Sequence, residues 1–313
     1  MSSLLVESAG LQTTVQDLGR PGFGPEGVSA SGAADPVALR LGNLLVENQP
    51  GVAGLELTLV GGSFVFPDGA VIALTGADLG ATVNGRPLEM WASHTLEPGT
   101  KLMFGATRNF ARGYLAIAGG IQVDPFLGSA STHVLSGLGG FEGRALRKGD
   151  RLRIGRASKN VRRRRITLAA LYAFKPRKVL RVTEGPQADW FSEAAKQVFY
   201  RDVFRVSEES DRVGLRLEGT ALEGSTAREM ITEGVSLGAV QVTPSGQPII
   251  LFVEQQTTGG YPKIANIIAA DLHRIGQLRP RAEIRFQRTS LAVARSLWIE
   301  QERLLNEPEQ LFT

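Results

Sequence analysis

The sequence predicts a mainly β protein with a few helices, built from barrels or sandwiches. The apolar residues occur in short runs rich in Val, Ile, Leu and Phe, and these runs are separated by Gly, Pro, Asn and Asp. The 313-residue chain contains 37 glycines, which favours many turns. Short strands separated by turns indicate a barrel or a sandwich rather than a parallel α/β sheet.

The first half of the chain carries seven of the expected strands. They are residues 4–8, 55–59, 63–66, 71–75, 101–104, 112–118 and 151–154. Asn84 and Gly85 predict a tight hairpin, because this pair suits the positive φ angles of a two-residue turn. A helix is expected over residues 37–46. Asp35 can cap its free backbone N–H groups, and Pro36 fits its first position.

The second half is expected to continue the β pattern. Its strands are residues 178–183, 203–206, 215–218, 240–243, 249–253 and 283–286, and its helices are residues 188–199 and 291–304, the latter capped by Ser290. Residues 155–165 are polar and basic and form the expected connection. We therefore predict an N-terminal domain over 1–160 and a C-terminal domain over 166–313, allowing for exchange of strands between the halves.

Composition excludes several classes of function. The chain has no cysteine, so it forms no disulfide and no thiolate zinc site. Its three histidines lie far apart, and no metal site is expected. No basic start followed by a long apolar core opens the chain, and no apolar run approaches the roughly 20 residues of a membrane helix. A cytoplasmic location without membrane contact is expected.

The net charge is +4, and the excess of arginine and lysine lies between residues 144 and 181. No aromatic residues alternate with these charges as in a nucleic-acid-binding surface. A solvated linker or an acidic partner explains the basic stretch better than nucleic acid.

Several catalytic motifs are absent. The chain lacks the P-loop, the dinucleotide-binding glycine pattern and the GxSxG elbow. It also lacks the Ala-Met-Lys-Met tetrapeptide of a biotin attachment site. If the protein is catalytic, partners are expected to complete its active site.

The strongest candidate site is the loop over residues 254–262, which follows an apolar strand. It reads Glu-Gln-Gln-Thr-Thr-Gly-Gly-Tyr-Pro. Gln and Thr side chains both donate and accept hydrogen bonds, and the two glycines predict a turn or close backbone approach to a ligand. Such a loop suits a small polar molecule with amide or carboxylate groups.

Two segments near the N-terminus have a similar character. Residues 13–22 contain Asp17 and Arg20, and residues 27–36 contain Ser31 and Asp35. Asp17 and Arg20 can pair with each other across a turn, or Arg20 can bind an anion with its planar guanidinium. Asp211 and Arg212 leave the same two alternatives open.

These segments resemble the biotin-dependent carboxyltransferase family, also called allophanate hydrolase subunit 2. The matching motifs include Thr-Thr-Val-Gln-Asp-Leu-Gly-Arg at 13–20, Ser-Ala-Ser-Gly-Ala-Ala-Asp at 29–35, Leu-Thr-Gly-Ala-Asp at 74–78, Tyr-Leu-Ala-Ile-Ala-Gly-Gly-Ile at 114–121, Gly-Gly-Phe-Glu-Gly-Arg at 139–144, Ser-Asp-Arg-Val-Gly at 210–214 and the loop at 255–262. The resemblance covers nearly the whole chain.

The resemblance implies two cyclophilin-like β-barrel domains. It further implies a hydrolase subunit, inactive alone, that works with companion subunits A and B to open 5-oxoproline to L-glutamate at the expense of ATP. No cofactor is expected to be bound covalently. Two alternatives stay open: a carboxyltransferase subunit that uses biotin to act on urea or a related amide, and a non-enzymatic antagonist of a kinase inhibitor.

Urea, the ureido ring of biotin and the lactam of 5-oxoproline each present a carbonyl beside N–H groups, which a Gln/Thr/Gly-rich pocket can satisfy. We therefore expect catalytic roles for Gln256, Thr257, Tyr261 and Asp17. Substrate binding is expected from Gln255, Thr258, Gly259 and Gly260 on one wall. Ser31, Asp35 and Arg20 or Arg212 are expected on the other side.

Overall fold

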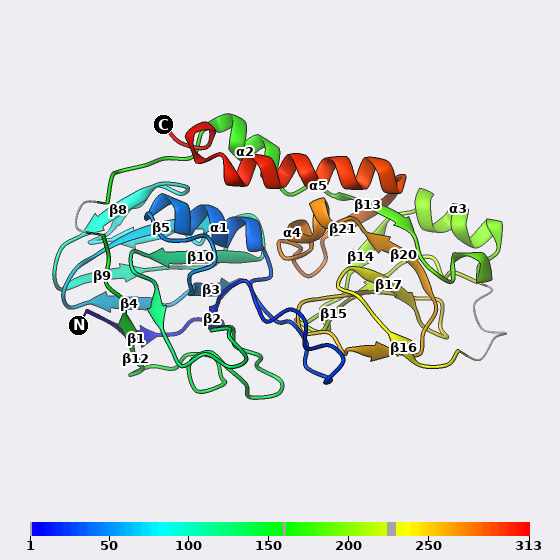
Figure 1. Cartoon of the computed structure of the whole chain (residues 1–313), viewed down its shortest axis with the longest axis horizontal. Helices are drawn as coiled ribbons and strands as arrows, with labels where there is room; N and C mark the ends of the chain where they lie inside the picture. Colours follow the sequence, from blue (N-terminus) through cyan, green and yellow to red (C-terminus); the bar gives the residue numbers. More distant parts are fainter. Residues whose placement is uncertain (1, 159–160, 224–229) are drawn as a thin grey trace. The chain divides into compact units, whose positions relative to one another are not determined.

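The computed structural model describes residues 2–158, 161–223 and 230–313. The chain divides into two compact units (Figure 1). Unit 1 consists of Met1–Arg20, Ser31–Lys175 and Leu304–Thr313, and unit 2 consists of Pro21–Ala30 and Pro176–Arg303. Both are built mainly from β-strands, which confirms the predicted fold class.

Unit 1 contains two open sheets. The seven-stranded sheet has the order β11-β12-β1-β4-β9-β6-β7, and the five-stranded sheet has the order β2-β3-β10-β5-β8. In chain order the strands are β1 (Ser3–Ser8), β2 (Gln12–Gln16), β3 (Gly54–Thr58), β4 (Ser63–Phe66), β5 (Ala70–Gly76), β6 (Thr82–Val83), β7 (Arg86–Pro87), β8 (Ser93–Leu96), β9 (Thr100–Met103), β10 (Arg112–Ile117), β11 (Ile121–Gln122) and β12 (Arg151–Ile154).

The two sheets of unit 1 share one apolar core. Alternate residues of each strand point into it, with Leu4 and Phe64 from one sheet and Leu55 and Leu115 from the other. Unit 1 is therefore a sandwich of open sheets. The family resemblance implies a barrel in each half of the chain, but the described strands of unit 1 form two open sheets that do not close into a barrel.

Helix α1 (Pro36–Leu45) covers the second face of the five-stranded sheet (Figure 1). Because β10 lies between this helix and the core, all six of its residues are buried. The predicted caps of α1 are confirmed: the Ala38 N–H donates to Asp35 Oδ1 at 2.9 Å, and Pro36 occupies the first turn. The chain end and α2 (Leu168–Phe174) extend this layer with further apolar side chains.

The predicted hairpin at Asn84 and Gly85 is also confirmed. Asn84 has a φ of 50° and Gly85 a φ of 74°, and the flanking strands β6 and β7 pair in antiparallel orientation. A β-branched residue at either turn position would be strained, which explains why this residue pair predicts the turn.

The basic segment expected as a linker lies within unit 1 where it is described. Arg164 N–H donates to Ser93 Oγ at 2.8 Å, and Ile166 N–H donates to Trp91 O at 2.9 Å. The Arg164 guanidinium pairs with Glu47 at 3.0 Å, and Arg165 pairs with Glu89. Local acidic side chains therefore already neutralise part of the basic stretch.

A buried polar network fixes the loop in front of α1. The Tyr114 hydroxyl donates to Glu56 Oε2 at 2.7 Å and accepts the Asp35 backbone N–H at 2.7 Å. The same Glu56 oxygen accepts the Ala34 N–H at 2.8 Å. Burial, reinforced by the Glu56 and Asp35 carboxylates, raises the pKa of Tyr114 well above 10. Tyr114 therefore stays protonated and ties α1 to the sheet.

Unit 2 contains a closed barrel of the order β13-β20-β17-β18-β15-β14-β21. Its strands are β13 (Val179–Glu184), β14 (Phe204–Val206), β15 (Gly214–Glu218), β17 (Ala239–Val242), β18 (Pro248–Leu251), β20 (Lys263–Ile267) and β21 (Glu283–Arg288). Strands β13 and β21 close it in parallel orientation, whereas the other pairs are antiparallel. A separate two-stranded sheet pairs β16 (Glu233–Gly234) with β19 (Thr258–Gly259).

Aromatic packing joins the barrel to α3 (Glu193–Arg201). The ring of Phe199 stacks on that of Phe286 of β21, with ring centroids 4.3 Å apart. The helix expected over residues 188–199 is in fact two elements, a 3₁₀ turn η1 (Ala188–Trp190) and α3. The break occurs because the Ser192 side chain accepts the Ala195 N–H at 3.1 Å and caps a new helix.

The remaining helical elements are η2 (Ala269–Asp271), α4 (Leu272–Ile275), α5 (Leu291–Asn306) and η3 (Pro308–Gln310). Ser290 Oγ accepts the Val293 N–H at 3.3 Å, which agrees with its predicted capping role. Over the described parts of the chain, none of the helices combines the length and the apolar character that crossing a membrane requires.

Replacing Tyr114 with Phe is expected to lower the free energy of unfolding by about 1–3 kcal/mol, because two buried hydrogen bonds to its hydroxyl are lost. Denaturant unfolding of the wild type and the variant measures this difference. A variant as stable as the wild type would contradict the role given to the network.

The same pair of proteins is expected to differ in alkaline solution. Unfolded tyrosine loses its proton near pH 10, whereas folded Tyr114 keeps it because its pKa is raised. The wild type should therefore lose stability more steeply above pH 10 than Tyr114→Phe, by up to about 1.4 kcal/mol per pH unit. Parallel stability curves over this pH range would show that Tyr114 does not titrate differently on unfolding.

Candidate functional site

Unit 2 contains a cavity of about 790 Å³ beside the two-stranded sheet. Its wall includes Gly24, Pro25 and Gly27 together with residues of β16, β19 and β20. Its polar side chains are Glu233, Ser236, Thr257, Thr258, Lys263 and Asn266. The cavity therefore joins part of the predicted Gln/Thr loop to a charged pair that the sequence reasoning did not single out.

Lys263 is the unusual member of this cavity, because its charged side chain is only 4% exposed. Its Nζ lies 2.5 Å from Glu233 Oε1, and the Glu233 side chain is 45% exposed. A buried ammonium is strongly destabilised in the absence of a partner, so the ion pair with Glu233 offsets the cost of burying the Lys263 side chain. Hydrogen bonding to Lys263 and then to Gln187 lowers the pKa of Glu233.

Gln187 connects both members of the pair to the barrel. Its Nε2 donates to Glu233 Oε1 at 2.9 Å, and its Oε1 accepts the Lys263 backbone N–H at 3.1 Å. Gln187 is itself buried and stands at the start of η1. One amide thus fixes the position of the carboxylate relative to the first residue of β20.

Gly259 lets the two-stranded sheet lie against the barrel. A Cβ at this position would be 2.5 Å from Gln241 Nε2 and 3.1 Å from Val235 Cγ1. Of the two roles expected for Gly259 and Gly260, a positive φ is found for neither, and Gly259 belongs to strand β19. Its glycine is required by close packing between neighbouring elements.

Most residues of the predicted loop do not line the cavity. Gln255 Nε2 donates to Val235 O at 3.3 Å, which ties the loop to the residue after β16. Gln256, Gly260 and Tyr261 are exposed, and the Tyr261 ring is free to contact a ligand or another protein. Of the predicted loop residues, only Thr257 and Thr258 line the cavity itself.

Arg212 lies behind this loop. It is buried and forms an ion pair with Glu254, whose backbone N–H donates to Arg212 O at 2.8 Å. Pairing of Arg212 with Asp211 is one of the two interpretations of the sequence, whereas in the structure Arg212 pairs with Glu254 at the start of the loop. Its contact with Glu254 anchors the start of the predicted site.

The predicted residues of the N-terminal segments lie in unit 1. The Asp17 carboxylate accepts four hydrogen bonds, from Gly19 N (2.7 Å), Ser129 Oγ (2.6 Å), Ala130 N (2.7 Å) and Ser131 Oγ (2.5 Å). Arg20 is fully buried and donates to Phe126 O at 3.3 Å and to Ser131 O. Both side chains therefore hold the segment 126–131 in place.

Ser31 and Asp35 also have structural contacts. Ser31 Oγ donates to Thr132 O at 3.0 Å, and Asp35 caps α1. The structure thus groups Asp17, Arg20 and Ser31 around residues 126–132 of unit 1, while Arg212 and residues 255–261 belong to unit 2.

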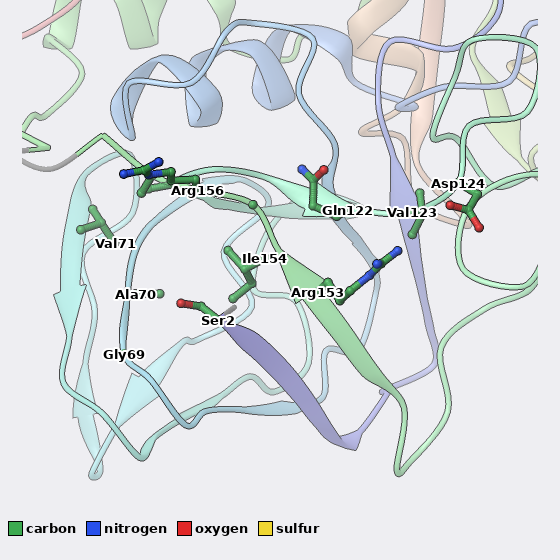
Figure 2. A pocket seen from close by; sticks show the side chains of 13 residues that line it. Ser2, Gly69, Ala70, Val71, Gln122, Val123, Asp124, Arg153, Ile154 and Arg156 are labelled. Atoms are coloured by element: carbon green, nitrogen blue, oxygen red, sulfur yellow. The ribbon is translucent and has the colours of Figure 1, made fainter.

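A second cavity of about 790 Å³ lies in unit 1, where residues 69–71, 122–124 and 153–157 meet (Figure 2). Its charged side chains, Asp124, Arg153 and Arg156, are exposed. Figure 2 shows the Arg153 and Arg156 side chains pointing in different directions. Among the described residues that line this cavity, none is a buried charged side chain, so the cavity at Lys263 is the better candidate site.

No metal site accompanies either cavity: within the described residues, no group of three or more His, Asp or Glu side chains could hold a metal ion. Sequence reasoning missed Lys263, Glu233, Gln187 and Asn266. The sequence does mark one of them. Lys263 stands directly before a mainly apolar stretch, residues 264–268, where a charged residue is unexpected.

Comparison with known proteins identifies the family. The model of the family "carboxyltransferase domain, subdomain A and B" matches residues 26–288. The chain is 38% identical over 304 residues to the C subunit of 5-oxoprolinase from Escherichia coli, covering 97% of both chains. It is 35% identical to the Haemophilus influenzae protein of the same name, covering 95% of this chain and 94% of that protein.

A solved structure agrees with these matches. The structure of K. lactis urea amidolyase superimposes with a TM-score of 0.87 at 31% identity and covers 97% of this chain, although the chain spans only 20% of that much longer protein. The chain belongs to the family of carboxyltransferase domains, subdomains A and B.

Proposed function

We propose that this chain is the C subunit of an ATP-dependent 5-oxoprolinase, which opens 5-oxo-L-proline to L-glutamate together with subunits A and B. The observation that carries the proposal is the buried Lys263 ammonium in a cavity otherwise rich in hydroxyl and amide groups. 5-Oxo-L-proline presents one carboxylate and one lactam, which matches one cation and several neutral donors and acceptors. The two relatives named as C subunits of 5-oxoprolinase match over nearly their whole length and support this function.

Each group of the cavity has a role in this proposal. The ammonium of Lys263 holds the substrate carboxylate. Thr257, Thr258 and Asn266 hydrogen-bond the lactam N–H and carbonyl, because hydroxyl and amide groups can serve both partners. Gln255, Gly259, Gly260 and Tyr261 surround the entrance, where the exposed side chain of Gln256 can turn toward the substrate carbonyl.

The lactam carbonyl is a poor electrophile because of amide resonance. Donors placed at the oxygen where negative charge develops lower the barrier to attack, and this is the contribution that we assign to Thr257, Thr258 and Gln256. We place Asp17, Arg20, Ser31, Asp35 and Arg212 among the positioning residues, because their contacts hold loops and a helix start.

We assign the use of ATP to the assembled complex, and the chain alone is proposed to be inactive. The chain has none of the nucleotide-binding patterns that a self-contained ATP site would show, so subunits A and B would supply the activating chemistry. A cytoplasmic location accompanies this proposal.

A second candidate is a carboxyltransferase subunit that acts on urea or a related amide with biotin. The close structural similarity to K. lactis urea amidolyase favours it. Urea is neutral, so in that reaction the carboxylate at Lys263 would be that of carboxylated biotin, whereas 5-oxoproline carries its own. The first candidate is favoured because the relatives that match over nearly their whole length are named 5-oxoprolinase subunits.

Purification of the chain with subunits A and B, followed by an assay of glutamate release from 5-oxo-L-proline and ATP, tests the proposed function. Turnover is expected only with all three subunits. Absence of glutamate from the complete mixture would overturn the function, and robust turnover by the chain alone would overturn its role as a dependent subunit.

Lys263→Met is expected to lower kcat/KM of the complete complex by about 10- to 100-fold, because one charge-assisted contact with the substrate is lost. The fold should persist, since Glu233 is 45% exposed and can be hydrated. Lys196→Met is a matched control, because it removes an ion pair with Glu193 elsewhere in unit 2. Equal kinetics of the two variants would exclude Lys263 from the site.

Gln256→Ala is expected to abolish turnover of the complete complex without lowering the melting temperature of this subunit. The Gln256 side chain is exposed, so its removal leaves the packing of the chain intact. Steady-state kinetics together with a thermal unfolding curve measure both effects. Wild-type turnover by the variant would remove the loop from the catalytic site.

A further inference from the structure

The ion pair in the cavity is asymmetric. Lys263 Nζ exposes less than 1 Å² to solvent, whereas the carboxylate that neutralises it belongs to a side chain that is 45% exposed. Solvent therefore reaches the carboxylate of the pair more readily than the ammonium. A carboxylate ligand at Lys263 would compete with Glu233 for the same ammonium.

The two partners also differ in how firmly the fold holds them. Lys263 begins β20, which pairs with both β13 and β17 in the closed barrel. Glu233 lies on β16, a strand of two residues that pairs only with β19 among the described strands. Gly234, the next residue, is exposed, and a Cβ there would meet no atom within 4 Å. The Glu233 side chain can thus turn toward water without disturbing the barrel.

We propose that Glu233 is an internal substitute for the carboxylate of the substrate, and that an incoming carboxylate displaces it from Lys263. The identity of that substrate rests on the function proposed above. Two carboxylates at one buried ammonium would leave an excess negative charge at low dielectric, so the incoming group exchanges with Glu233 rather than adding to it. When the product leaves, Glu233 returns and neutralises Lys263 again.

The exchange makes the cavity selective for carboxylate ligands. A neutral lactam cannot replace Glu233, because Lys263 would then be buried without a counter-charge. Gln187 helps the exchange to be reversible, since its Nε2 donates to Glu233 and can donate equally to another carboxylate in the same position.

The test compares Glu233→Gln with the wild type in the complete complex. The variant keeps the size of the side chain and removes its charge, so the substrate no longer competes with an internal anion. KM for 5-oxo-L-proline is expected to fall by at least about threefold. Glu208→Gln is the matched control, because it removes an exposed ion pair with Arg281 in the same unit and should leave KM unchanged. An unchanged or higher KM in Glu233→Gln would overturn the proposal.

A second measurement needs no activity and therefore separates this inference from the proposed function. In thermal unfolding of the isolated chain, sodium acetate is expected to raise the melting temperature of Glu233→Gln more than that of the wild type or Glu208→Gln, because acetate replaces the missing carboxylate. The neutral lactam 2-pyrrolidinone should have no such effect. Equal shifts by acetate in all three proteins would overturn the exchange, whether or not the complex releases glutamate.

Discussion

The charge of Lys263 is the constraint on which the arrangement of the cavity depends. An ammonium at the first residue of a barrel strand is excluded from water and must have an anion beside it. Glu233 supplies the anion, Gln187 orients it, and the two-stranded sheet brings it within reach. Gly259 is needed to hold Glu233 at this distance, because a larger residue would push the two-stranded sheet away from the barrel.

Unit 1 uses one buried and one partly buried carboxylate, Glu56 and Asp17, in a comparable way. Glu56 accepts hydrogen bonds from the Tyr114 hydroxyl and from the Ala34 N–H, and Asp17 accepts four from its own turn and from residues 129–131. In each case one carboxylate satisfies several donors of an irregular segment that could not otherwise be buried. The loops of unit 1 that carry the family motifs are thus held by polar contacts from the sheets beneath them.

Local patterns predicted much of the secondary structure. Alternating or continuous apolar runs identified β4 and β12, the Asn-Gly pair identified the β6–β7 turn, and Asp35 with Pro36 identified the start of α1. Strands β2 and β8 were missed, because polar residues such as Thr13, Thr14 and Ser93 are buried in them. Their burial depends on neighbours from distant parts of the chain and leaves no mark in the local pattern.

The candidate site could be predicted only in part. Thr257 and Thr258 stand beside a cavity, as the composition of their loop indicated, whereas Asp17, Arg20 and Arg212 are engaged in holding other segments. Lys263 and Glu233 are 30 positions apart in the sequence and belong to different sheets, so no spacing rule connects them.

By itself, therefore, the sequence determined the β-rich class, several turns and caps, and the polar character of one loop, because these depend on residues that are neighbours along the chain. Only the tertiary structure decided that unit 1 is a sandwich and unit 2 a closed barrel, and that a buried lysine meets its carboxylate beside the cavity. Those outcomes depend on strand order and burial, which arise when distant segments pack together and exclude water.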